Sequence, residues 1–104
     1  MIHTVREDET GYQDFTLYDE NGPFDGSTGS PTVSMILADR VGGIVDMTNK
    51  VAWLVAANGS VRVSPAVGDL KAERAPYTAV YIVTLNTLTY AFPNREPDTW
   101  KVWK

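Results

Sequence analysis

The sequence contains no cysteine. This absence excludes disulfides, cysteine-ligated zinc, iron–sulfur clusters and thiol nucleophiles. Small secreted domains often depend on disulfides, so a chain without them favours folding inside a cell.

Histidine is almost as scarce, with His3 as the single copy. A catalytic or metal-binding histidine needs partners held around it, whereas chain termini are usually mobile. We therefore expect His3 to be exposed and without a functional role. One histidine and no cysteine leave no basis for a hydrolytic triad or a zinc site, so we expect no enzyme, no metal and no cofactor.

Carboxylates are the remaining candidates for chemistry. Residues 19–25 place Asp, Asn and Gly in a pattern that resembles an oxygen-rich calcium loop. The spacing of an EF-hand and its bidentate Glu are missing, and ordinary turn chemistry explains the same residues. The cluster Glu7-Asp8-Glu9 points alternately to opposite faces of a strand, which indicates a solvated edge rather than a catalytic pair.

Clustered positive charge and long apolar runs are also missing. The nine Lys and Arg residues are scattered, and the net charge is −4. Binding to a phosphate backbone usually needs clustered Lys and Arg, so we expect no nucleic acid partner. No apolar stretch approaches the roughly 20 residues of a membrane span, and residues 1–4 do not resemble a signal peptide. We expect a soluble protein without membrane contact.

In place of helical periodicity, the sequence has short alternating segments separated by turn residues. About eight of them follow one another at spacings of roughly 8–12 residues, which is typical of a β-sandwich or barrel. They cover residues 4–9, 12–18, 32–38, 44–56, 60–64, 77–85, 88–92 and 99–103. We predict an all-β, immunoglobulin-like β-sandwich of about seven to eight mostly antiparallel strands, formed by a single domain over residues 1–104.

Local features refine this prediction. Asn58-Gly59 is the clearest hairpin signal, and residues 69–74 favour one short helical turn. Residues 77–85 form the longest apolar run and are predicted to be a central strand, because both of its faces are apolar. Tyr77 follows the pattern of a tyrosine corner, in which the hydroxyl turns back onto backbone a few residues upstream. The alternative is an ordinary core aromatic.

Aromatic side chains supply the candidate binding residues. Trp100 and Trp103 are three positions apart in a strand, so they lie on opposite faces and one of them must be partly exposed. Tyr12 and Tyr18 point away from the apolar face of their strand. Exposed Trp and Tyr are enriched at protein interfaces. We take Tyr12, Tyr18, Trp100 and Trp103 as candidate partner-binding residues, while packing under a loop of the same chain and stacking on a carbohydrate stay open.

Four segments carry a resemblance to a known family. They are the extended start at residues 4–9 with the turn 8–11 and the strand 14–18, the turn 19–22, the hairpin 58–63, and the run 76–81 followed by Phe92-Pro93 and a closing strand. In this order they resemble the N-terminal immunoglobulin-like domain of phage baseplate upper proteins and related small phage virion proteins. The similarity spans nearly the whole chain.

In that family the domain is a docking unit that attaches receptor-binding or fibre regions to the tail. We expect no fibre or stalk segment after Lys104, and the resemblance then implies a virion protein that decorates, plugs or cements a shell or tail. Expected partners are tail, baseplate or capsid proteins, contacted by many copies in a symmetric assembly. The expected location is the virion, after folding in the host cytoplasm. The alternative function is a carbohydrate-binding β-sandwich module.

Overall fold

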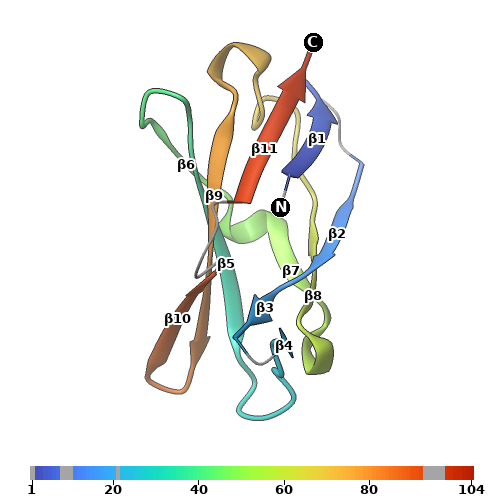
Figure 1. Cartoon of the computed structure of the whole chain (residues 1–104), viewed down its shortest axis with the longest axis vertical. Helices are drawn as coiled ribbons and strands as arrows, with labels where there is room; N and C mark the ends of the chain where they lie inside the picture. Colours follow the sequence, from blue (N-terminus) through green and yellow to red (C-terminus); the bar gives the residue numbers. More distant parts are fainter. Residues whose placement is uncertain (1, 8–10, 21, 93–97) are drawn as a thin grey trace.

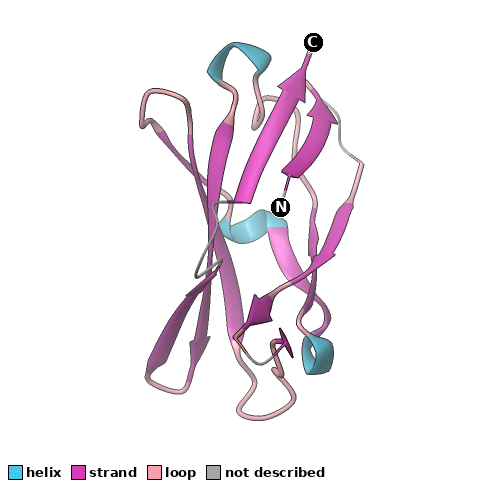
Figure 2. Cartoon of the chain, in the orientation of Figure 1, coloured by secondary structure: helices cyan, strands magenta, loops and turns pink. Residues whose placement is uncertain are grey.

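Strands dominate the computed structural model, which describes residues 2–7, 11–20, 22–92 and 98–104 (Figures 1 and 2). The strands are β1 (Ile2–Arg6), β2 (Gln13–Thr16), β3 (Tyr18–Asp19), β4 (Gly22–Pro23), β5 (Thr32–Ala38), β6 (Ile44–Asp46), β7 (Val51–Val55), β8 (Ser60–Val63), β9 (Tyr77–Leu85), β10 (Leu88–Phe92) and β11 (Asp98–Trp103). Short 3-10 turns separate some of them: η1 (Thr48–Lys50), η2 (Ala56–Asn58) and η3 (Ala72–Arg74). The protein is therefore all-β, as the alternating pattern predicts.

The strands form two main sheets. The larger has the order β1-β11-β9-β5-β6, with β10 also paired to β9, and the smaller has the order β2-β8-β7. The pairing of β1 with β11 is parallel, and the other described pairs are antiparallel. The molecule measures 40 × 24 × 22 Å and carries the C-terminus near one end of its long axis (Figure 1). This arrangement is compatible with a β-sandwich.

The core lies where the two sheets face each other. Tyr77, Tyr81 and Val83 alternate along β9 and are buried, as the period of a strand requires. Met35 of β5 is buried beside Tyr81, its register partner. Val61 of β8 contributes from the smaller sheet. The prediction that β9 is central is confirmed, since it pairs with β5, β10 and β11.

The predicted strand at residues 44–56 is wrong as a single element. Its first part is β6 of the larger sheet and its second part is β7 of the smaller sheet. Between them, the Asp46 carboxylate accepts hydrogen bonds from the backbone N and Oγ1 of Thr48, at 2.9 and 2.6 Å. Met47 is fully buried at the same point. The chain therefore turns from one sheet to the other at a polar interruption in an otherwise apolar run.

The Asn58-Gly59 hairpin is confirmed between β7 and β8. Gly59 has a φ of 73°, and a Cβ there would lie 2.7 Å from the backbone oxygen of Leu17. Only glycine meets both conditions at this turn.

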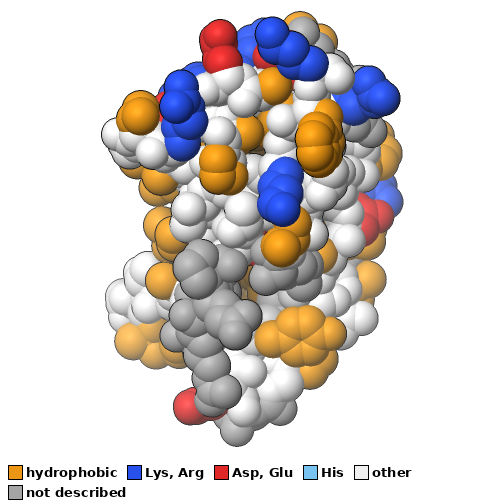
Figure 3. All heavy atoms as spheres, turned by 45° about the horizontal axis from the view of Figure 1, so that its top comes forward, with side chains coloured by type: hydrophobic (Ala, Val, Ile, Leu, Met, Phe, Trp, Pro, Cys, Tyr) orange, Lys and Arg blue, Asp and Glu red, His pale blue; other side chains and the backbone are white. Residues whose placement is uncertain are grey.

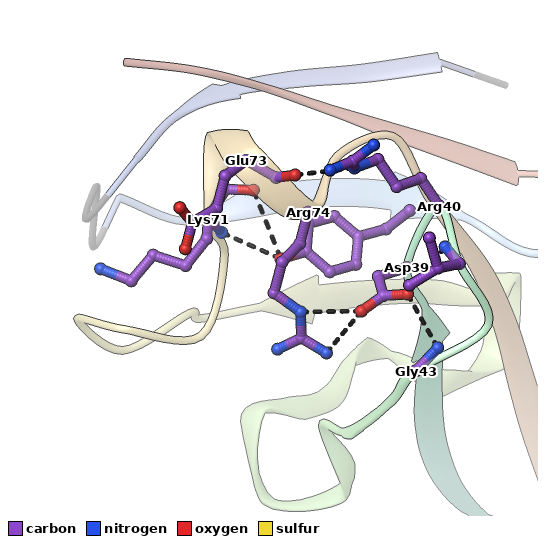
Figure 4. Close-up of polar contacts among 8 residues, drawn as sticks. Asp39, Arg40, Gly43, Lys71, Glu73 and Arg74 are labelled. Carbon is purple, nitrogen blue, oxygen red and sulfur yellow. Dashed lines mark hydrogen bonds and ion pairs between the residues drawn. The ribbon is translucent and has the colours of Figure 1, made fainter.

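The tyrosine corner is confirmed as well. The hydroxyl of Tyr77 accepts a hydrogen bond from the backbone N of Lys71 at 3.0 Å and lies 3.4 Å from the Lys71 carbonyl oxygen (Figure 4). The predicted helical turn is present in part as η3. Tyr77 thus fixes the connection that crosses from the smaller sheet to the larger one.

A second set of contacts ties η3 to the loop between β5 and β6 (Figure 4). The Asp39 carboxylate accepts from Nε and Nη2 of Arg74 at 2.8 and 2.7 Å, and from the backbone N of Gly43 at 2.7 Å. Arg40 donates from its backbone N to the Arg74 carbonyl and from Nε to the Glu73 carbonyl. Two loops far apart in sequence are joined in this way at one end of the molecule.

The ion pair at Asp39 predicts a pH dependence. Hydrogen bonding to Arg74 holds the pKa of Asp39 below its usual value of 3.8. Stability from this group is therefore present above about pH 4 and is lost as pH falls through the lower native pKa. We expect Asp39→Asn to be less stable than the parent at pH 7, with a difference that shrinks towards pH 3. Urea unfolding at pH 7 and at pH 3 measures the difference in the free energy of unfolding between the two proteins. A difference that is the same at both pH values contradicts the prediction.

Candidate docking surface

A polar network lies inside the core, and it overturns the expectation for His3. His3 is 7% exposed and Asp98 is 4% exposed, and His3 Nε2 lies 2.9 Å from Asp98 Oδ2. Parallel pairing of β1 with β11 sets His3 opposite Trp100, and the two rings stack with centroids 4.4 Å apart. The N-terminal strand is therefore held in the sheet, and it carries its histidine inward.

Tyr81 and Trp100 complete this network. The Tyr81 hydroxyl donates to Asp98 Oδ2, and Trp100 Nε1 donates to the Tyr81 oxygen at 3.1 Å. Burial raises the pKa of Tyr81 far above its ordinary value, and the Asp98 charge raises it further, so the hydroxyl stays a donor. Phe15 covers the group, with its ring 4.6 Å from that of His3. The four polar side chains bind one another and join β1, β9 and β11.

The predicted binding aromatics do not form one surface. Trp100 is fully buried, so its assignment as a partner-binding residue is wrong, because its face of β11 packs into the core. Trp103 is 61% exposed on the opposite face, as the spacing of the two residues requires. Tyr12 and Tyr18 are exposed too, but Tyr12 lies under the guanidinium of Arg62, 4.4 Å from Cζ to the ring centroid. Tyr18 begins β3, far along the molecule from the end of β11 (Figure 1).

The larger sheet has one face that the smaller sheet does not cover. Alternate residues of β9 fill the core, so the residues between them point outward. The neighbouring strands continue this surface across the sheet. Strands β5, β10 and β11 pair with β9, β6 pairs with β5, and β1 pairs with β11. We call it the outer face: Ile2, Thr4, Arg6, Thr32, Ser34, Ile36, Ala38, Ile44, Asp46, Thr78, Val80, Ile82, Thr84, Thr89, Ala91, Thr99, Lys101 and Trp103.

Charge is confined to the margins of the outer face. Asp46 lies on β6, while Arg6 and Lys101 lie on β1 and β11 at the other side. The centre consists of Thr, Ser, Ala, Val and Ile, and Val80 is 41% exposed there. Solvated faces of antiparallel sheets are usually polar, whereas exposed apolar surface marks interaction sites. The outer face is therefore the candidate docking surface.

The sequence carries a signal for this face in residues 77–85. Val80 and Ile82 make the second face of residues 77–85 apolar, which predicts a central strand. The described part of the chain covers only the side of Tyr77 and Tyr81. A strand that is apolar on both faces indicates either a second covering layer or a partner.

Comparison of the chain with protein-family models, with curated proteins and with solved structures finds no match. Within the described ranges, no three His, Asp or Glu side chains are grouped in a way that would hold a metal ion. The same residues contain no helix with the length and apolar character needed to cross a membrane. In the acidic cluster of residues 7–9, Glu7 accepts from the backbone N of Ala72 at 3.1 Å, and Asp8 and Glu9 lie outside the described residues.

Proposed function

We propose that this chain is an immunoglobulin-like structural domain of a phage virion that docks onto tail, baseplate or capsid proteins through its outer face. The observation that carries the proposal is the exposed, uncharged centre of that face at Val80 and its neighbours. The tyrosine corner at Tyr77 supports the immunoglobulin-like assignment, since this motif ties the sheets of such sandwiches.

The size of the outer face supports an assembly of many copies. Six strands spaced about 4.8 Å apart, with about five residues each at 3.3 Å, cover roughly 480 Å². A standard stable interface buries about 800 Å² per partner. One copy therefore binds weakly, and linked copies in a lattice gain affinity through their effective concentration. A symmetric virion supplies that multiplicity.

A charge in the centre of the outer face tests the proposal. We expect Val80→Lys to prevent incorporation into virions, because docking would bury an unpaired ammonium group. Val67→Lys is the matched control, since Val67 is more exposed than Val80 and lies in the loop before η3. The measurement is mass spectrometry of virions purified from the phage that encodes the chain, after circular dichroism has shown that both variants fold.

Incorporation of the parent and of Val67→Lys, with loss of Val80→Lys, supports the proposal. Absence of the parent chain from virions contradicts the virion assignment. Incorporation of Val80→Lys at the parent level contradicts the assignment of the surface.

A further inference from the structure

One end of the molecule presents an exposed tryptophan among cations. Trp103 pairs with Arg6 in the β1–β11 register, so both point outward from the sheet, and Lys101 lies two residues away on the same face. Arg6 also reaches the backbone of Lys104 through Nη1, at 3.3 Å from the carbonyl oxygen. All four residues are exposed. Figure 3 shows Lys and Arg side chains together with hydrophobic ones at this end, with Asp or Glu side chains beside them; we call it the basic end.

Glu7 lies at the same end and contacts both β11 and η3. Glu7 follows β1, and its Oε1 accepts a hydrogen bond from the backbone N of Ala72 in η3. Its own backbone N donates to the Trp103 carbonyl at 2.6 Å. Glu7 thus joins the end of β11 to η3.

A groove of about 560 Å³ lies at the opposite end, between β10 and the segment around β3 and β4. Its described lining is Asp19, Glu20, Phe24, Asp25, Leu85, Thr89, Tyr90, Ala91 and Phe92, which includes three carboxylates and neither Lys nor Arg. We call it the acidic groove. Phe24 and Phe92 are buried with their rings edge to face at 5.5 Å, and Tyr90 packs on Phe24 at 6.2 Å while staying partly exposed. Hydrogen bonding to Ser27 lowers the pKa of Asp25, which is therefore ionised at neutral pH.

The two ends match in size, polarity and charge. Ligand-binding pockets have volumes of about 300–1,000 Å³, so the acidic groove can take a large aromatic side chain with its flanking residues. Tryptophan is among the residues that dominate binding energy at interfaces when it enters such a pocket. The cations beside Trp103 would then lie near the carboxylates of Asp19, Glu20 and Asp25. Opposite charges at the rim steer association and fix its orientation.

The ends cannot meet within one molecule, because they lie at opposite ends of its 40 Å axis (Figure 1). We infer that copies of this chain associate head to tail, with Trp103 of one copy seated in the acidic groove of the next. Such an interface joins two different surfaces, so it propagates into rings or filaments instead of closing as a two-fold dimer. The inference does not depend on the proposed function, since it needs neither a virion protein nor the centre of the outer face.

Sedimentation velocity of the purified chain tests the association. We expect oligomers at about 0.05 M salt that dissociate towards monomers at about 1 M salt, where the Debye length falls to about 3 Å. Trp103→Ala removes the inserted side chain, and the double variant Asp19→Lys with Asp25→Lys reverses the charge of the groove. Each is expected to weaken self-association at least about tenfold. Tyr12→Ala, a truncated exposed aromatic elsewhere, and Val80→Lys are the controls and should associate like the parent.

A mixture of the two defective proteins gives the decisive result. Trp103→Ala keeps an intact groove and the charge-reversed protein keeps an intact basic end, so together they should form one-to-one dimers that do not grow. A parent chain that stays monomeric at low salt, or a mixture that stays monomeric, overturns the inference. Loss of association in Val80→Lys also overturns it, because the outer face would then be the self-association surface.

Discussion

Replacing Asp98 with alanine is expected to lower the free energy of unfolding by about 3–5 kcal/mol. The Asp98 carboxylate is the shared acceptor of the buried network, and its loss leaves the Tyr81 hydroxyl and His3 Nε2 without that partner inside the core. Folded domains are stable by only about 5–15 kcal/mol, so this change removes a large part of the total. Urea unfolding followed by tryptophan fluorescence measures it, with Trp100 next to the altered site.

Two variants control for this effect. Asp98→Asn keeps a carbonyl oxygen that can accept from Tyr81, so it should lose distinctly less stability than the alanine variant. Asp14→Ala removes an exposed carboxylate that pairs with Arg62 at 2.8 Å, and exposed pairs contribute little. If Asp98→Ala is no more destabilising than Asp14→Ala, the buried network does not hold β1 to the sheet.

This network is the part of the core that sequence patterns did not predict. Thr32 to Ala38 and Tyr77 to Leu85 alternate strongly enough to define β5 and β9 to the residue, and the corner at Tyr77 has a local signature. His3 and Asp98 are 95 positions apart. Their contact depends on a parallel pairing of the two terminal strands, which no local periodicity encodes. A polar residue directly after Pro97 is typical of a turn, so Asp98 gave no sign of burial.

The candidate docking surface shows a different limit of the sequence. Alternation predicts correctly that Val80 and Ile82 lie opposite Tyr81, yet it does not say what covers them. The turn at Asp46 to Thr48 determines what covers these two residues, because it sends β7 into the smaller sheet instead of extending the larger one. Both sides of β9 are therefore apolar while only one is packed within the described chain. Sequence periodicity assigns a residue to a face, and topology determines whether that face is covered.

Replacing Trp100 with alanine is expected to lower the free energy of unfolding by about 3–5 kcal/mol, because it removes the largest fully buried side chain from the core and leaves a cavity. Its indole stacks on His3, meets the edge of Phe15 at 6.3 Å between centroids, and donates to Tyr81. At roughly 4–8 °C per kcal/mol for a domain of this size, the melting temperature should fall by at least about 10 °C. Differential scanning calorimetry measures the change.

Trp103→Ala is the matched control, since it removes the same side chain from the opposite, exposed face of β11. Its effect on stability should stay within about 0.5 kcal/mol, as is usual for surface substitutions. The two tryptophans therefore separate folding from association. Trp100→Ala should unfold at lower temperature, whereas Trp103→Ala should melt like the parent at about 1 M salt, where both are monomeric, and should fail to form oligomers at low salt. Equal melting temperatures for the two variants would contradict the burial of Trp100, and with it the inward orientation of Asp98 on the same face of β11.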